Sequence, residues 1–238
     1  MIGGWTMSDI VAKYCNDELD LYNAKLSDEY HYESLSLCVI DAIFSIGVRY
    51  ASTRQTVIKY CDFYGMKRIR DDFNSLPVEA EQESILQLIN RIENKGIEEF
   101  TDEVLKNRQR TSTCNGILKT DAVLRFAKIL KEFNVEYLQD IYRIINNDKF
   151  EEEIKKIPGQ KSGISLKYFF MLAGSSDFIK PDRMIIRFLE KVINKKVELE
   201  EAQNLLREAS EVLKVQFPNI TPRMLDHEIW KKMSSTNN

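Results

Sequence analysis

Apolar residues recur at helical spacing along almost the whole chain, and this periodicity constrains the fold more than any other feature. Only 9 of the 238 residues are glycine and 5 are proline, and strand-like alternation is scarce. We therefore predict an all-α fold. The expected helices lie near residues 35–46, 85–96, 120–130, 148–157, 163–174, 183–192, 197–214 and 222–230.

Three of these helices have recognisable starts. Asp148 and Glu151 have the spacing of a capping box, and Thr120 is a candidate cap for the helix that follows it. Thr221 followed by Pro222 predicts an N-cap with proline at the first helical position.

The charge balance excludes some classes of protein. The chain is 30% charged and has no apolar stretch near the roughly 20 residues that a membrane span requires. The first residues lack the features of a secretory signal, so we expect a cytoplasmic protein with no membrane partner. A net charge of −3 argues against nucleic acid. However, residues 155–196 contain 10 Lys and Arg against 3 acids, so the basic charge is concentrated there.

The cysteines and histidines do not suggest a metal site. Cys15, Cys38, Cys61 and Cys114 are far apart, and the two histidines lie at opposite ends of the chain. We therefore expect neither a metal nor another cofactor.

The most informative segment runs from Lys155 to Leu189. A helix is expected to end at Ile157, Pro158-Gly159 forces a tight turn, and Gly163 opens a second helix. Such a turn exposes backbone N–H groups at a helix N-terminus, where they can bind a phosphate oxygen. The simpler alternative is an ordinary αα-hairpin.

A loop and a third helix follow. Gly174 ends the second helix, and Asp182 opens the third after Lys180-Pro181. Together with the hairpin, this order resembles the helix-hairpin-helix (HhH-GPD) superfamily of base-excision DNA glycosylases. The matching residues are Ile157, Pro158, Gly159, Gly163, Gly174 and Asp182. The alternative for Asp182 is a plain helix N-cap.

The resemblance implies an all-α fold with an active-site cleft between two helical subdomains. By order and spacing it covers residues 32–193, with hairpin residues 157–163. Residues 1–31 would be a helical extension, residues 194–233 would pack on the core, and residues 234–238 read as a disordered tail. The expected contacts with double-stranded DNA are Pro158, Gly159, Gln160, Lys161, Ser162, Gly163 and Lys180.

A glycosylase extrudes its target nucleotide from the stack at a cost of a few kcal/mol. The hairpin would hold the phosphates, while Asp182 would stabilise the oxocarbenium ion or activate water. Bifunctional members have a Schiff-base lysine where this chain has Gly163, so the resemblance implies a monofunctional enzyme. Lys161, two residues earlier, is a candidate phosphate contact or a solvated turn residue. In the loop that the family wedges into DNA, Arg49 or Tyr50 would fill the gap left by the flipped base.

A second acid stands out on the helix from Leu35 to Ile46. Apolar residues occupy both sides of this helix, and Asp41 is its only charge. A buried carboxylate is costly unless it is paired, which makes it a candidate catalytic group. Adenine-removing members of the superfamily carry a catalytic Glu close to this position. Equally, Asp41 pairs with a buried Arg or a backbone amide and fixes the fold.

Two further clusters are candidates. Arg108 and Arg110 lie in a polar run that either contacts DNA or is an ordinary exposed loop. His227 and Trp230, three residues apart on the last helix, either read an extruded base or fill the core.

The function expected from the resemblance is monofunctional DNA N-glycosylase activity by a monomer. It would hydrolyse a damaged, mismatched or modified base from duplex DNA and leave an abasic site, in base-excision repair or in phage defence. The alternatives are a non-catalytic DNA-binding or damage-sensing module and a helical interaction protein with no DNA role. The sequence leaves the base itself open.

Overall fold

The structure is a computed structural model that describes residues 4–236. Within this range the regular secondary structure is helical apart from two isolated β-bridges, Tyr32 with Ile69 and Arg110 with Leu118. The predicted all-α class is therefore confirmed. No helix in the described range is long and apolar enough to cross a membrane.

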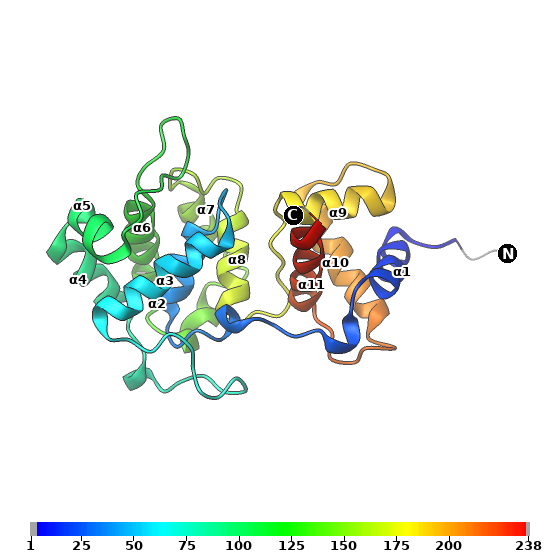
Figure 1. Cartoon of the computed structure of the whole chain (residues 1–238), viewed down its shortest axis with the longest axis horizontal. Helices are drawn as coiled ribbons and strands as arrows, with labels where there is room; N and C mark the ends of the chain where they lie inside the picture. The colour runs from blue at the N-terminus through cyan, green and yellow to red at the C-terminus, as the bar shows by residue number, and fades with distance from the viewer. Residues whose placement is uncertain (1–3, 237–238) are drawn as a thin grey trace. The chain divides into compact units, whose positions relative to one another are not determined.

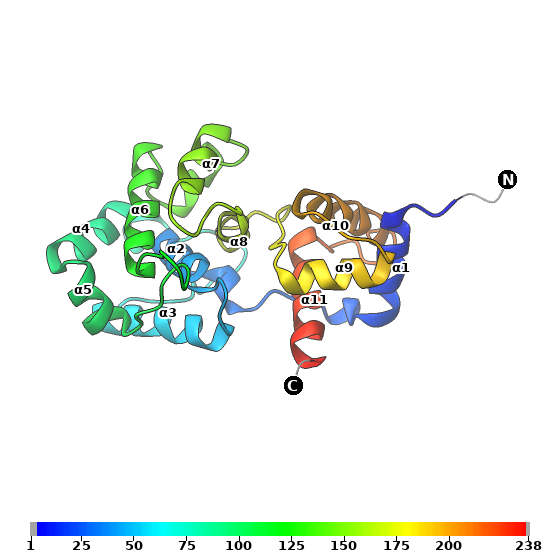
Figure 2. The same ribbon diagram turned by 90° about the horizontal axis from the view of Figure 1, so that it is seen from above.

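The chain divides into two compact units (Figures 1 and 2). Unit 1 combines residues 1–27 with residues 175–238, so the blue α1 lies among the yellow-to-red helices α9, α10 and α11. Unit 2 is residues 28–174. The helices of unit 1 are α1 (Met7–Glu18), a 3-10 helix (Leu21–Asn23), α9 (Arg183–Ile193), α10 (Leu199–Leu213) and α11 (Pro222–Thr236).

The α-helices of unit 2 are α2 (Leu35–Phe44), α3 (Tyr50–Tyr64), α4 (Ile85–Lys95), α5 (Ile97–Glu99), α6 (Lys119–Glu132), α7 (Asp148–Lys155) and α8 (Ile164–Leu172). Its shorter elements are 3-10 helices at Asp28–His31, Glu79–Glu81 and Leu138–Arg143, and a π-helix at Phe100–Leu105.

This division differs from the boundaries expected from the sequence. Helix α9 packs on α1, α10 and α11, so residues 183–193 belong with the N-terminal helix and not with a core spanning 32–193. Buried residues from all four helices form one apolar core, including Val11, Ile185, Phe188 and Leu206. Helix α11 continues to Thr236, so residues 234–236 are helical, while the rest of the expected disordered tail, 237–238, lies outside the described residues.

The helix starts agree with the sequence at some positions and not at others. Helix α11 begins at Pro222, and the Met224 N–H donates to the Thr221 hydroxyl at 3.3 Å, as predicted. The expected cap at Asp148 is wrong because Asn147 caps α7. The expected cap at Thr120 is also wrong: α6 starts one residue earlier, and the Thr120 hydroxyl instead bonds that of Thr101 at 2.6 Å.

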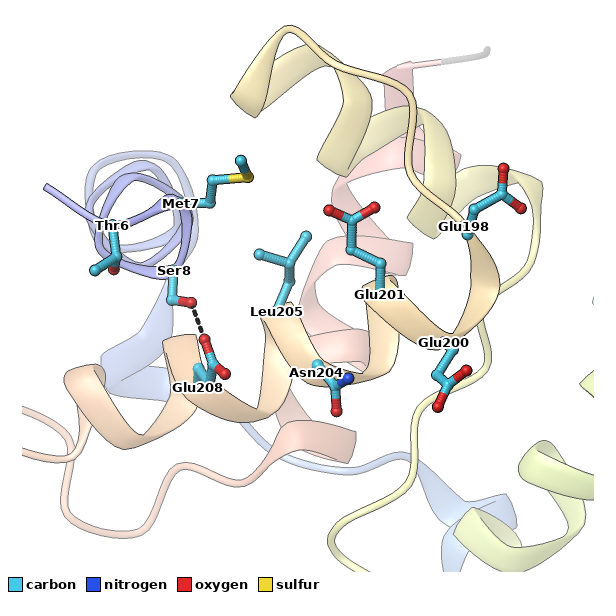
Figure 3. A pocket seen from close by; sticks show the side chains of 9 residues that line it. All are labelled: Thr6, Met7, Ser8, Glu198, Glu200, Glu201, Asn204, Leu205 and Glu208. Carbon is cyan, nitrogen blue, oxygen red and sulfur yellow. Dashed lines mark hydrogen bonds between the residues drawn. The ribbon is translucent and has the colours of Figure 1, made fainter.

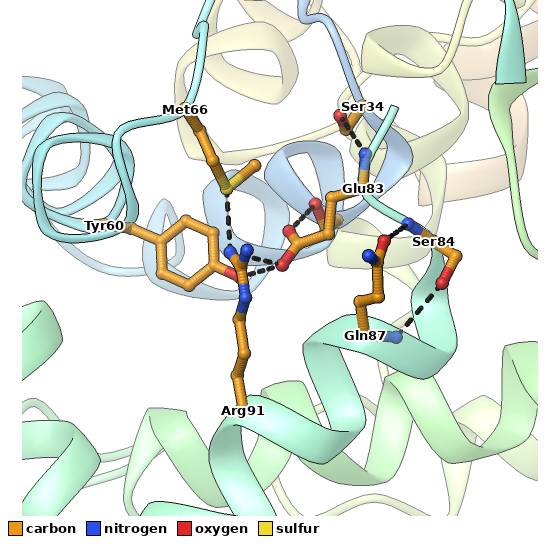
Figure 4. A network of polar contacts seen from close by, with 8 residues as sticks. Ser34, Tyr60, Met66, Glu83, Ser84, Gln87 and Arg91 are labelled. Carbon is orange, nitrogen blue, oxygen red and sulfur yellow. Dashed lines mark hydrogen bonds and ion pairs between the residues drawn. The ribbon is translucent and has the colours of Figure 1, made fainter. Parts of the chain in front are cut away.

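A network around the buried Glu83, which precedes α4, joins α2, α3 and α4 in unit 2 (Figure 4). Arg91 on α4 lies 2.6 Å from a carboxylate oxygen of Glu83, and the Tyr60 hydroxyl donates to the same oxygen at 2.6 Å. The second oxygen of Glu83 accepts from Ser36 on α2 at 2.5 Å. Burial raises the pKa of Glu83, and the Arg91 charge opposes that rise. Because every partner is satisfied, the network fixes three helices to one another without offering a reactive group.

Candidate functional site

The hairpin expected from the sequence is formed between α7 and α8. Gly159 and Gly163 have φ values of 88° and 74°, which favour glycine. The Gln160 N–H donates to Ile157 O at 2.9 Å, and the Gly163 N–H donates to Gln160 O at 3.0 Å. The N–H groups of the exposed Lys161 and Ser162 find no acceptor among the described residues. They are thus available to an oxygen of a ligand.

The underside of the turn packs against the loop that precedes α6. A Cβ on Gly159 would lie 2.5 Å from Thr111 Cβ, so only glycine allows this approach. Gln160 is 3% exposed, and its Oε1 has no hydrogen-bond partner within the described part of the chain. The backbone N–H and C=O of Gln160 are bonded within the turn, so the DNA contact expected at this residue finds no unbonded backbone N–H.

Asp41 on α2 is fully buried in unit 2. Its carboxylate accepts hydrogen bonds from the hydroxyls of Tyr32 (2.6 Å), Ser45 (2.7 Å) and Tyr50 (3.1 Å). Burial raises the pKa values of Tyr32 and Tyr50, and the charge of Asp41 raises them further. These hydroxyl groups were not among the partners expected from the sequence, which were a buried Arg or a backbone amide. Through them Asp41 holds the turn between α2 and α3.

That turn carries both wedge candidates. Arg49 is exposed and immediately precedes α3, whereas Tyr50 is half-buried and bonded to Asp41. Lys119, which sequence reasoning missed, supports the same turn from α6. Its ammonium donates to Phe44 O (3.0 Å), Ile46 O (2.9 Å) and the Gln109 side chain (3.3 Å), and the residue is only 2% exposed.

Arg108 and Arg110 are both engaged inside unit 2. Arg108 pairs with Glu98 at 2.7 Å and Asp102 at 2.6 Å. The Arg110 guanidinium donates two hydrogen bonds to Gly116 O, at 3.0 and 2.6 Å, and so closes its own loop. Exposed ion pairs are weak. Arg108 can therefore release Glu98 and Asp102 to bind a phosphate more readily than Arg110 can release the Gly116 carbonyl group.

In unit 1, Asp182 caps α9. Its Oδ1 accepts from Met184 N at 2.8 Å and from Ile185 N at 3.2 Å. The side chain is half-buried, and Oδ2 makes no hydrogen bond within the described residues. One oxygen thus builds the helix while the other is left for a ligand.

A second acid, Asp226 on α11, holds the segment that leads into this cap. Its Oδ2 accepts from the Lys180 N–H at 2.7 Å. Burial raises the pKa of Asp226 well above the usual range, and the negative charge of Asp182 raises it further. Two carboxyl groups with different environments are a common arrangement of acid–base sites. The sequence places Asp226 next to His227, but its partner Lys180 is 46 residues away, so sequence reasoning missed the role of Asp226.

The predicted base pocket is closed on itself. The rings of His227 and Trp230 stack at a centroid distance of 5.9 Å and an interplanar angle of 17°, which leaves no room for a base between them. Burial, with a smaller effect of the Lys231 charge, lowers the pKa of His227 to about 4. The imidazole is therefore neutral at physiological pH.

A hollow of about 600 Å³ lies between the start of α1 and α10 (Figure 3). Four glutamates line it: Glu198, Glu200, Glu201 and Glu208. Glu208 accepts a hydrogen bond from the Ser8 hydroxyl. Such a surface repels phosphate. Among the described residues, no group of three or more His, Cys, Asp or Glu is placed to hold a metal ion.

Comparison with known proteins identifies a family without naming an activity. Neither a curated protein nor a solved structure matches the chain at significant similarity. One family model, a domain of unknown function (DUF8548), matches residues 9–234. Because this match spans both units, the chain belongs to the DUF8548 family.

Proposed function

We propose that this protein is a monofunctional DNA N-glycosylase, a divergent relative of the helix-hairpin-helix glycosylases. One observation carries the proposal: a glycine-bounded hairpin with two unbonded N–H groups is followed along the chain by a helix capped by Asp182. The hairpin supplies a phosphate site, and Asp182 supplies a carboxylate with one oxygen left over. The hairpin belongs to unit 2, and Asp182 belongs to unit 1.

In the proposed reaction, Asp182 acts on the deoxyribose of an extruded nucleotide. The bond between C1′ and the base nitrogen breaks, and its electron pair leaves with the base. The Asp182 carboxylate stabilises the oxocarbenium ion and takes a proton from the attacking water, whose oxygen bonds to C1′. The departing base takes a proton from solvent and Asp182 releases to solvent the proton that it took from water, so the products are a free base and an abasic site.

Asp226 positions Asp182 in this scheme. Its carboxyl group fixes the Lys180 amide, and Lys180 is two residues before the cap. Burial raises the pKa of Asp226, so this group has a weaker tendency than an ordinary carboxyl group to place negative charge beside Asp182.

The lyase step has no amine at the expected place. Gly163 is the N-cap of α8, and the exposed Lys161 lies in the turn. Borohydride trapping on a cleaved substrate tests this directly, because a covalent adduct requires an amine nucleophile. We expect no adduct.

A non-catalytic DNA-binding module is the second candidate. The observation that favours it is that Oδ1 of Asp182 already accepts two backbone N–H groups, as in an ordinary cap. A panel of duplexes with damaged, mismatched and naturally modified bases, including DNA from phages with modified bases, separates the two candidates. A glycosylase produces abasic sites in at least one duplex, whereas a binding module produces none.

A further inference from the structure

The outward face of α9 carries a row of three cations that the proposed chemistry does not use. Arg183, Arg187 and Lys191 follow one another at intervals of four residues, and all three are exposed. The opposite face of α9 is buried in the core of unit 1 through Ile185, Phe188 and Leu189. Because residues four apart are neighbours on a helix surface, the three cations form one row, here called the α9 row.

None of the three cations of the α9 row has a carboxylate within 4.0 Å among the described residues. The only acid inside α9 is Glu190, and its side chain accepts from Val197 N at 3.3 Å. Elsewhere the chain places an acid three or four residues from an exposed cation, as in Arg125 with Asp121 and Lys214 with Glu211. In α9, Glu190 is three residues from Arg187, but the two form no ion pair within 4.0 Å, and Glu190 is bonded to Val197 N instead.

Like charges four residues apart destabilise a helix by about 0.2–0.5 kcal/mol per pair. The α9 row contains two such pairs, and no ion pair with the one acid of the helix, Glu190, offsets them. Helix α10 of the same unit is the opposite, with several acids on its surface: Glu200, Glu201, Glu208 and Glu211. Unit 1 therefore has a row of exposed cations on α9 and a mainly acidic surface on α10, and a local basic surface of this kind attracts a polyanion.

The spacing of the row suits a DNA strand. Four residues of α-helix rise about 6 Å, so the row is about 12 Å long. Over that length of duplex axis each strand presents about three or four phosphates. The row also begins at the residue after Asp182, the group proposed to act on the deoxyribose.

We propose that the α9 row binds the phosphate backbone of duplex DNA along the strand that carries the target nucleotide. This inference rests on the proposed function, because DNA is taken as the partner. The row adds a second phosphate-binding surface, on unit 1, to the hairpin of unit 2. It also locates part of the basic charge of residues 155–196 on one exposed helix face.

The test is duplex binding by the full chain as salt is raised from 50 to 200 mM, measured by fluorescence anisotropy. The variant Arg183→Gln/Arg187→Gln/Lys191→Gln removes the three charges from exposed positions. The slope of log affinity against log salt is negative, and each lost phosphate contact reduces its magnitude by about 0.9. For three lost contacts we expect the magnitude to decrease by about 2.7. At 0.1 M salt this corresponds to a loss of affinity of up to about 500-fold.

Two matched variants show whether the row itself is responsible. Lys13→Gln/Arg207→Gln/Lys214→Gln removes the same charge from exposed positions on α1 and at α10, and we expect the slope to be unchanged. Arg183→Lys/Arg187→Lys/Lys191→Arg keeps the charge of the row, and we expect affinity within a few-fold of the wild type. Thermal unfolding of each variant shows that it is folded.

The outcomes test two separate claims: that the α9 row binds duplex DNA, and that the protein releases a base. An unchanged slope in the row variant, or an equal loss in the matched control, overturns the proposal even if bases are released. Loss of binding to phosphatidylserine vesicles without loss of duplex binding also overturns it, because the partner would then be a membrane. If the row variant loses duplex binding and no duplex yields a free base, the row stands and the glycosylase proposal fails. A wild-type chain with no duplex affinity at 50 mM salt overturns both.

Discussion

Substitution of Asp182 separates its structural role from its chemical role, because its two oxygens have different environments. Oδ1 accepts both capping bonds, from Met184 N and Ile185 N, while Oδ2 accepts none within the described residues. In Asp182→Asn the amide oxygen can occupy the place of Oδ1, and the amide nitrogen replaces Oδ2. The cap then survives, but the negative charge and the second acceptor are lost.

The magnitudes follow from these contacts. Asn caps a helix about as well as Asp, and loss of a charge at a helix N-terminus costs about 0.3–1 kcal/mol. We therefore expect Asp182→Asn to change the free energy of unfolding by less than about 1 kcal/mol. Asp182→Ala also loses both capping bonds, and we expect a loss of about 1–2 kcal/mol.

The two Asp182 variants should differ in stability but should both lose base-release activity. Loss of a carboxylate that stabilises the transition state typically costs about 10²–10³-fold or more, so both Asp182→Asn and Asp182→Ala should be slow. Urea unfolding measures stability, and single-turnover release of the base measures the chemistry. Asp177→Asn, at an exposed acid of the same unit, is the matched control and should change neither. Full activity in Asp182→Asn, or equal stability of the Ala and Asn variants, would refute the reasoning.

Three other substitutions test the surroundings of the site. Lys119→Met removes the donor of one buried and two partly buried acceptors and should lower the free energy of unfolding in urea by about 1–3 kcal/mol; a loss below 1 kcal/mol would contradict this. Asp226 has a raised pKa in the folded state, so wild-type stability should fall as pH rises from about 3.9 through that pKa. Asp226→Asn should remove this fall and unfold at a higher temperature than the wild type at pH 8, whereas an unchanged pH profile would exclude the buried acid as its source. Gly159→Ala forces a methyl group against Thr111 and should lower both the melting temperature and duplex affinity. Gly65→Ala has a similar positive φ but open space around it, and should affect stability alone.

The hairpin and eight of the helices could be predicted because their signals are local, whereas α3 (Tyr50–Tyr64) was not among the expected helices. Periodicity within one segment defines each helix, and Pro158-Gly159 with Gly163 defines the turn between α7 and α8. The helix start at Pro222 was equally local. At α7 the cap moved by one residue because Asn147, which also caps helices well, precedes Asp148.

The partners of buried charged groups could not be predicted, since they come from distant parts of the chain. The carbonyl groups of Phe44 and Ile46, which Lys119 binds, are more than 70 residues away. Asp226 meets the Lys180 amide across 46 residues. A single sequence contains the residue types but not the packing that joins them. For the same reason, the sequence did not indicate that α9 belongs with α1.

Release of a free base into solution is the measurement that tests the proposed function most directly. The wild-type chain is incubated with the duplex panel, and free bases are identified by mass spectrometry while abasic sites and strand breaks are counted on the same DNA. We expect one free base for each abasic site in at least one duplex, and no strand breaks above the buffer control. Salt-sensitive binding with no free base from any duplex would contradict the proposed glycosylase and leave a DNA-binding module.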